Sequence, residues 1–364
     1  MYIKQLVFTN YRNLQDGCLH PSESINVICG SNAQGKTNLI ECIWLFTGGR
    51  SFRGAKEKEL IAFGKEFSRI KLAFFSEGRD QTLELLIEKG RRKAVLNGVP
   101  RSYLSEIVGK FGAVVFSPDH LTLVKSGPEE RRAFIDGAIC QIQPMYASLL
   151  SRYKKILNER NTLLKSIPYH PQLSETLPVW NESLAACGAK ITRERAVYIQ
   201  ALSVSAVRFY DGISKGKEKL TVAYKMNCKA DTGSDESEIY AKTLERLNSK
   251  QQEDISCGYT TSGVHRDDLI IRINDRDARN FGSQGQQRSA VLSLKLAEAA
   301  MIEQNKGEAP VVLLDDVLSE LDTSRQQYLL TKLSGMQVFI TCCEKTIPTD
   351  HCIMVEEGSI SCQT

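Results

Sequence analysis

The sequence predicts an α/β protein built around a phosphate-binding loop, with a mixed sheet and an inserted helical lobe. Residues 30–37, Gly-Ser-Asn-Ala-Gln-Gly-Lys-Thr, match the pattern G-x-x-x-x-G-K-[ST] without a mismatch. Residues 25–29 before this loop form an apolar, β-branched run typical of a buried strand, and residues 39–46 after it have a helical pattern. Residues 310–316, Pro-Val-Val-Leu-Leu-Asp-Asp, form a second apolar run that ends in two carboxylates, as in a central parallel strand. These three observations predict a nucleotide-binding fold.

Composition agrees with an ordinary globular protein. The chain has 364 residues, of which 42% are hydrophobic and 25% charged, and it is long enough for two or three domains. A net charge of +4 is too small to establish a polyanionic partner, but it leaves room for local basic patches. Because there is no run of eighteen apolar residues and the N-terminus begins in a strand-like pattern, we expect a cytoplasmic protein without a membrane partner. Eleven cysteines without a C-x-x-C pair indicate reduced core residues.

The phosphate loop and the acidic strand supply the groups that a nucleotide and its metal need. The glycines allow successive backbone N–H groups and the helix N-terminus to face one phosphate chain. Lys36 is expected to reach the β and γ phosphates, and the Thr37 hydroxyl to bind Mg²⁺. Asp315 is expected to hold Mg²⁺ through water, and Asp316 to polarise the water that attacks the γ phosphate. The loop residues predicted to contact the nucleotide are Gly30, Ser31, Asn32, Ala33, Gln34, Gly35, Lys36 and Thr37.

The N-terminal part of the chain predicts a sheet-rich lobe. Residues 3–10 alternate as in a strand and precede a turn at Asp16-Gly17, which places Arg12 about a hairpin's length from the phosphate loop. Further strands are predicted at residues 70–75, 82–87, 94–99 and 113–116, with an Asn-Gly hairpin turn in the third of these segments.

The middle of the chain predicts a mainly helical lobe. Pro128 is well placed at a helix start, and helical patterns continue to about residue 254. Two segments, 145–167 and 175–210, predict an antiparallel helical pair, with Pro168, Pro171 and Pro178 breaking the chain between them. We expect an acidic mobile loop at residues 231–238. The predicted nucleotide-binding lobe therefore consists of residues 1–120 and 255–364, folded together around the insertion at residues 121–254.

Basic residues could mark a surface for nucleic acid. The segment 151–165 contains five basic residues against one acid, although a solvated helix face is the more common role of such a run. Other candidate patches, each equally open to that simpler interpretation, are Lys56, Lys58 and Arg91-Arg92-Lys93.

A second glycine-containing loop precedes a long helix predicted at residues 286–304. Ser283 and the amide of Gly285 would stand at the positive end of this helix. A helix N-cap is the simpler interpretation of the motif by itself. Since one nucleotide needs only one such cradle, a second one more than two hundred residues downstream indicates that it closes on the γ phosphate of another subunit's nucleotide.

Four motifs resemble those of ABC-type ATPases of the SMC class: Walker A at 30–37, the signature at 283–286, Walker B at 313–316 and the D-loop at 319–322. The resemblance is closer still to the RecF family of bacterial recombination mediators, which are similar to an SMC head without long coiled-coil arms. The segments that carry this resemblance lie in family order at residues 8–14, 32–39, 116–119, 265–268 and 283–288.

The resemblance implies an ABC-type ATPase head that binds ATP and Mg²⁺. It adds Asn13, Asn38 and Gln286 to the expected nucleotide contacts, beside Arg12, Ser283 and Gly285. It also implies an ATP-dependent homodimer on duplex or gapped DNA and a partnership with the RecO and RecR mediators that load the recombinase. Any ATPase activity would be weak and DNA-stimulated, serving as a binding switch.

The sequence departs from the wider ABC pattern at several positions. Asp316 stands where most ABC ATPases have Glu, and Thr341 is the only polar residue near the expected place of the switch histidine, so we expect slow hydrolysis. Val264 replaces a usual Pro, which should alter loop stiffness more than chemistry, and residues 116–119 lack the glutamine of a Q-loop.

Two other classes of function stay open at this point. A small-molecule phosphotransferase would bind an acceptor in the helical insertion and use ATP rapidly without DNA, but the signature loop argues against it. An ABC transporter's cytoplasmic ATPase subunit would depend on a membrane partner, which fractionation would reveal.

Overall fold

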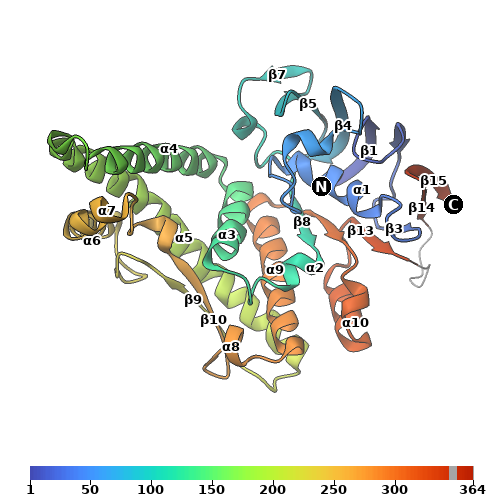
Figure 1. The fold of residues 1–364 in the computed structure, drawn as a ribbon. Coiled ribbons are helices and arrows are strands. Elements are labelled where there is room, and N and C mark those ends of the chain that lie inside the picture. The colour runs from blue at the N-terminus through green and yellow to red at the C-terminus, as the bar shows by residue number, and fades with distance from the viewer. Residues whose placement is uncertain (344–350, 364) are drawn as a thin grey trace.

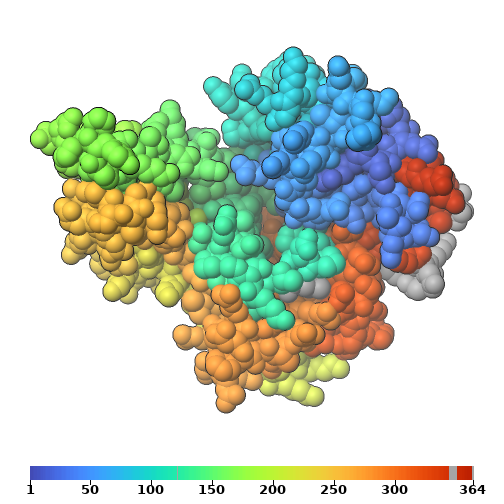
Figure 2. Space-filling model, in the orientation of Figure 1, coloured from blue at the N-terminus to red at the C-terminus, as the bar shows by residue number. Residues whose placement is uncertain are grey.

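The computed structural model describes residues 1–343 and 351–363. Figure 1 shows a sheet-rich lobe that carries both chain ends, and a helical arm formed mainly by α4 (Pro144–Ser166) and α5 (Leu177–Ser214). In Figure 2 the green outer part of the arm projects away from the blue and cyan surface of the sheet-rich lobe. The predicted α/β architecture with a helical part is confirmed.

A six-stranded sheet forms the centre of the sheet-rich lobe, in the order β15-β14-β3-β13-β12-β8. The strands from β14 to β8 are parallel, and only β15 is antiparallel to its neighbour. All residues of β8 and β12 are buried, as expected for short apolar strands that are covered on both faces. The strands of this sheet are β3 (Ile25–Cys29), β8 (Ala113–Phe116), β12 (Val311–Leu314), β13 (Val338–Cys342), β14 (Cys352–Glu356) and β15 (Ser359–Gln363). The strands predicted within 25–29, 113–116 and 310–316 are therefore confirmed.

A second six-stranded sheet is antiparallel, in the order β2-β1-β4-β5-β6-β7. Its strands are β1 (Tyr2–Thr9), β2 (Gly17–Leu19), β4 (Phe67–Ser76), β5 (Arg79–Glu88), β6 (Arg91–Leu96) and β7 (Val99–Arg101). The strands predicted at 70–75 and 82–87 are confirmed and pair antiparallel, with Ile70 opposite Leu85, and Asn97 and Gly98 both have the positive φ of the predicted hairpin turn. The turn expected at Asp16-Gly17 leads directly into β2, which sequence reasoning missed because it is only three residues long.

Helix α1 (Lys36–Trp44) joins the two sheets into one core. Leu39, Ile40 and Ile43 are fully buried, in a cluster that includes Leu72 of the antiparallel sheet and Leu313 of the parallel sheet. The short helix η1 (Leu45–Thr47) extends it. Because both sheets pack around α1, the phosphate loop at its N-terminus rests on a rigid base.

The other face of the parallel sheet packs against the helical part of the molecule. Val312 of β12 belongs to the same buried cluster as residues of α5 and α9 (Gln284–Lys306). The remaining helices of this part are α3 (Pro128–Ile142), α6 (Glu236–Ser249), α7 (Gln251–Cys257), α8 (Ala278–Phe281) and α10 (Thr323–Lys332), with α2 (Pro118–Leu121) beside the sheet. Five further short helices are η2 (Glu57–Leu60), η3 (Leu104–Glu106), η4 (Pro171–Thr176), η5 (Val264–Arg266) and η6 (Leu318–Glu320).

A small sheet ties the helical segment to the C-terminal half of the chain. Strand β9 (Leu220–Lys225) pairs antiparallel with β10 (Asp268–Ile273), which also pairs with β11 (Arg276–Asp277). We expected a mainly helical lobe up to residue 254, and β9 within it was missed. The boundaries at residues 120 and 254 stay a prediction, since the chain passes between the two parts without a break in the core.

Three details of the predicted helical part are wrong. Pro178 does not break the chain, because it lies in the first turn of α5, where proline has no bond to lose. Glu236–Glu238 are not part of a loop, since Asp235 accepts a hydrogen bond from the Glu238 amide and starts α6 there. Arg160 of the basic segment is not on the surface.

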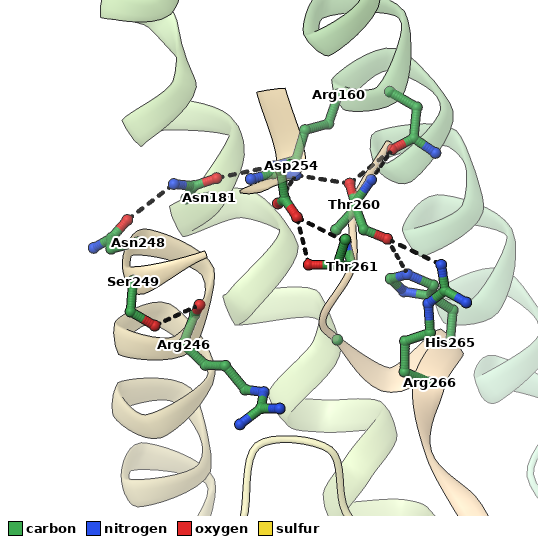
Figure 3. Close-up of polar contacts among 12 residues, drawn as sticks. Arg160, Asn181, Arg246, Asn248, Ser249, Asp254, Thr260, Thr261, His265 and Arg266 are labelled. Carbon is green, nitrogen blue, oxygen red and sulfur yellow. Dashed lines mark hydrogen bonds and ion pairs between the residues drawn. The ribbon is translucent and has the colours of Figure 1, made fainter. Parts of the chain in front are cut away.

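Arg160 is fully buried and forms the centre of a polar network inside the arm (Figure 3). Its guanidinium donates to Asp254 at 2.8 Å, Asn181 at 2.9 Å and Thr260 at 2.7 Å. These partners come from α7, α5 and the segment before η5, so the network braces the arm against the loop that leads back to the sheet-rich lobe.

Candidate nucleotide site

The phosphate loop is held in a shape that only glycine allows at its two ends. Gly30 and Gly35 have φ values of 153° and 119°. A Cβ on Gly30 would lie 2.2 Å from the Val355 carbonyl oxygen of β14. Gly35 is the N-cap of α1 and offers no side chain to its first amides, so these donors have no side-chain acceptor in the described part of the chain. An uncapped helix N-terminus is suited to bind phosphate.

Lys36 is nearly buried and lies across this loop. Its ammonium donates to the carbonyl oxygens of Gly30 at 2.5 Å and Ser31 at 3.0 Å, and it is 3.9 Å from Cys343 Sγ. The cation is thus next to the amides that would surround a phosphate chain.

The two carboxylates after β12 reach the same place. Thr37 Oγ1 donates to Asp315 Oδ1 at 2.9 Å, and Thr341 Oγ1 donates to the same oxygen at 3.1 Å. Burial raises the pKa of Asp315, and these two hydrogen bonds oppose the shift. Asp316 has the left-handed backbone (φ 52°), and its N–H donates to Thr341 Oγ1 at 2.8 Å. Thr341 therefore connects both carboxylate residues to the end of β13.

These groups line one cavity of about 370 Å³. Its walls are formed by Asn32, Ala33, Gly35, Lys36, Thr37, Asn38, Arg53, Asp316 and Thr341. The cavity thus brings together part of the predicted loop, the helix start and Asp316, and Asp315 lies behind them, hydrogen-bonded to Thr37. The predicted loop residues Gly30, Ser31 and Gln34 do not line it. Sequence reasoning did not assign Arg53 to the site or a role to Thr341, because neither belongs to a motif. Arg53 is positioned by a hydrogen bond to Asn38 Oδ1 at 2.9 Å.

Arg12 and Asn13 lie beside the phosphate loop but differ in their hydrogen-bond partners. The Arg12 guanidinium donates to both oxygens of Glu41 of α1, at 2.6 and 2.9 Å, and Tyr11 donates to the same carboxylate. Asn13 Oδ1 accepts from Asn38 at 2.5 Å, and its amide donates to the Ala33 carbonyl at 3.4 Å. Asn13 therefore contacts the loop directly, whereas Arg12 holds the helix behind it.

The turn between β14 and β15 supports the loop from another side. The Glu357 amide donates to Gln34 Oε1 at 2.5 Å, and the Gly358 amide donates to the Gln34 carbonyl at 3.2 Å. The Gly358 carbonyl in turn accepts from the Gln15 amide at 2.8 Å. Gln34 is thus fixed by residues more than three hundred positions away, a role that no local pattern indicated.

The signature loop is not part of this cavity. Ser283 is the N-cap of α9, with Oγ accepting from the Gln286 amide at 3.2 Å while Gln286 Oε1 accepts from the Ser283 amide at 2.8 Å. The Gln286 amide group also donates to Glu218 at 2.7 Å, and Arg325 contacts the Gly285 carbonyl. In residues 1–343 and 351–363, no hydrogen bond joins 283–286 to the phosphate loop. The N-cap is therefore confirmed, whereas the expectation that this loop closes on the nucleotide of another subunit stays a prediction.

The other family-like segments have structural partners. Ser117 caps α2, and Asp267 accepts hydrogen bonds from Tyr224 at 2.5 Å and the Asn227 amide at 2.7 Å. His265 lies 2.9 Å from Tyr153, and burial lowers its pKa to about 4. Through the contacts of His265 and Asp267, segment 265–268 links α4 to β9 within the helical part.

Among the described residues, no group of three or more His, Cys, Asp or Glu side chains could hold a metal ion. Thr37 and Asp315 still fit Mg²⁺, because this ion takes one or two protein oxygens and completes its shell with water and phosphate. None of the helices in the described ranges is long and apolar enough to span a bilayer.

Comparisons with known proteins agree with this geometry. The family described as "RecF/RecN/SMC N terminal domain" matches residues 2–355. A "DNA replication and repair protein RecF" of Ruminiclostridium cellulolyticum is 41% identical over 347 residues, which cover 95% of this chain and 93% of the relative. The protein of the same name from Lachnoclostridium phytofermentans is 38% identical over 99% of both chains.

Solved structures give the same result. A structure of the recombination mediator protein RecF with ATP in the RecFOR pathway has a TM-score of 0.95 and 37% identity, covering 100% of this chain and 98% of the other. An Smc head bound to the C-winged helix domain of ScpA has a TM-score of 0.58 at 16% identity, covering 100% and 97%, and shares the fold. The predicted ABC-type ATPase head is confirmed, and the chain belongs to the RecF family of DNA replication and repair proteins.

Proposed function

We propose that this protein is an ATP-dependent DNA-binding switch of recombinational repair and replication-fork maintenance. Two copies close around two ATP molecules, bind duplex or gapped DNA and help to load the recombinase at single-strand gaps. Slow hydrolysis then releases the DNA. The relatives that match this chain over nearly its full length are DNA replication and repair proteins, which favours this proposal over a phosphotransferase or a transporter subunit.

One observation carries this proposal: within the described residues, no hydrogen bond joins the phosphate cradle to the second helix N-terminus, at residues 283–286. The cradle at 30–38 combines uncapped amides with Lys36 and Thr37. The signature at 283–286 has none of these partners. A second copy facing the first would bring a signature loop onto each cradle, so ATP would become part of the dimer interface.

The roles of the site residues follow from their chemistry. Lys36 and Arg53 would offset phosphate charge, and Thr37 and Asp315, which share a hydrogen bond, would hold Mg²⁺. Mg²⁺ would neutralise the charge that develops on the β and γ phosphate oxygens. Asp316, held by Thr341, orients the attacking water, and its side chain is one methylene shorter than Glu, which explains a slow reaction. The Gly30–Asn38 backbone, Asn13, Ser283, Gly285 and Gln286 complete the nucleotide contacts.

The partners are proposed from the relatives. A protein of 37% identity is a mediator in the RecFOR pathway, and we extend its association with RecO and RecR to this chain. The proposed location is the cytoplasm, where gapped DNA and these mediators occur.

Sedimentation of the full chain with ATP, ADP or no nucleotide, with and without gapped DNA, tests the proposal. We expect dimers only with ATP, and DNA in the dimer fraction. Lys36→Met should stay monomeric under all conditions, while Lys229→Met, which changes an exposed lysine outside the cavity, should behave as wild type. A nucleotide-independent monomer that turns over ATP rapidly without DNA would overturn the proposal and favour a phosphotransferase.

A further inference from the structure

We propose that Phe63 stacks on an unpaired base of gapped DNA, at a hollow between two turns of the sheet-rich lobe. This inference rests on the proposed DNA-binding function and assigns a contact for the single-stranded part of the substrate. It starts from the exposure of Phe63, which at 105% is the largest among the exposed large hydrophobic side chains of the described residues. A ring in this position buries no apolar surface in the core and leaves its own apolar surface exposed to water. The stability of the fold therefore does not require it.

The loop that presents Phe63 is rigid. The Ala62 amide donates to the Asn10 carbonyl at 2.8 Å, Ile61 forms a bridge with Tyr11, and the Lys65 amide donates back to Ala62 at 3.0 Å. Gly64 takes a positive φ of 75°, which completes a tight turn with Phe63 at its tip. A ring held this way loses little freedom on binding, which favours stacking.

The ring borders an open hollow of about 710 Å³. The opposite side is formed by Lys89 and Gly90 in the turn between β5 and β6, both with positive φ. A hollow of this size is ample for a base and its sugar.

Charge around the hollow favours a polyanion. In the described part of the chain, Lys58, Lys65, Lys89 and Arg91 have no carboxylate within ion-pair distance, and the first three line the hollow. Two nearby acids are already neutralised, because Glu57 pairs with Arg92 at 2.9 Å and Glu88 with Lys93 at 2.5 Å. Glu59 and Glu66 also line the hollow, which leaves an excess of one cation in the lining, and Arg91 next to Gly90 adds a second beside it.

Of the basic residues that the sequence singled out at 91–93, only Arg91 is therefore available for a ligand. Arg92 is buried beside Glu57. An exposed aromatic ring among unpaired lysines is the arrangement that binds single-stranded nucleic acid, since the ring stacks on a base while the lysines contact phosphates.

The test compares two DNA molecules of equal length, a gapped duplex with 2-aminopurine in the gap and a continuous duplex, with the full chain and ATP. Phe63→Ala should weaken binding to the gapped DNA about five- to hundredfold, as expected for one stacked base, and leave duplex binding unchanged. It should also abolish the quenching of 2-aminopurine. Phe63→Trp should keep both the affinity for gapped DNA and the quenching of 2-aminopurine. Tyr103→Ala, which removes another exposed ring of the same lobe away from the hollow, should behave as wild type.

Four results would overturn the inference alone while the wild type binds DNA normally. These are an unchanged affinity of Phe63→Ala for gapped DNA, an equal loss on both DNAs, persisting 2-aminopurine quenching, and a loss of ATP-driven dimers without DNA, which would make a second copy the occupant. A wild-type protein that binds neither DNA with ATP would overturn the proposed function and this inference together.

Discussion

The N-termini of α1 and α9 are constructed in opposite ways, although both are expected to face phosphate. At α1 the N-cap is Gly35, and no side chain accepts from the first amides. At α9, Ser283 and Gln286 satisfy each other's amides in a capping box. A phosphate at α1 therefore meets open donors, whereas one at α9 must compete with the Ser283 hydroxyl. In the proposed dimer, this difference predicts an order of events in which ATP binds at α1 first and α9 of another copy follows.

The largest effects are expected from substitutions at the N-terminus of α1 or of α9. Lys36→Met and Ser283→Arg should each abolish ATP-driven dimerisation and hydrolysis, because the first removes the cation of the cradle and the second blocks the facing helix end. A mixture of the two proteins should regain up to roughly half of wild-type hydrolysis, since neither variant dimerises with itself and every mixed dimer contains one complete site out of two. ATPase assays on the mixture, with mixed dimers verified by differently tagged subunits, measure this.

If Ser283 served the nucleotide of its own chain, no pairing would rebuild a site. If mixed dimers form but recover no activity, the proposal that the α9 N-terminus completes the nucleotide site of the other subunit is wrong.

The next effect concerns Asp316, whose side chain lines the cavity at α1. Asp316→Asn should slow hydrolysis by about a hundredfold or more, as for the loss of a positioned base, and leave ATP binding intact. Single-turnover assays and equilibrium dialysis separate the two quantities. A loss of nucleotide binding would instead make Asp316 a metal ligand and Asp315 the base.

Thr341 should have a smaller effect of the same kind. Thr341→Val leaves the Asp316 amide without its acceptor and removes a donor to Asp315, so hydrolysis should fall by about tenfold at nearly constant ATP affinity. Thr341→Ser keeps the hydroxyl and should restore most of the rate. Equal losses in both variants would assign Thr341 to packing only.

The smallest effect is expected from removing the N-cap that Ser283 forms at α9. Ser283→Ala should lower the free energy of unfolding by about 1 kcal/mol, as for other lost N-caps. Ser283→Asn should preserve the cap and hence the stability in urea unfolding, while still weakening ATP-driven dimers. Stability and dimerisation that change in parallel in both variants would show that Ser283 only caps.

Sequence reasoning succeeded where the relevant contacts are local. The strand, loop and helix around Lys36, and the carboxylates after β12, follow from short motifs and apolar periodicity, and the structure brings them together. That these residues bind nucleotide in the proposed roles stays a prediction. The features that were missed depend on partners distant in sequence: Arg160 meets Asp254 and β9 meets β10. A charged residue on a helical stretch looks the same in sequence whether it faces water or a buried carboxylate.

Strand β3 has a further consequence for how the protein is made. It pairs on one side with β13 and on the other with β14, so that Cys29 and Ile28 are opposite residues synthesised more than three hundred positions later. At about 5–20 residues per second, this strand waits on the order of tens of seconds for its neighbours. During that interval it exposes unpaired apolar edges, a hazard for which cells provide chaperones. The phosphate loop that follows β3 therefore gains the support of Glu357 and Gly358 only after almost all of the described chain has been synthesised.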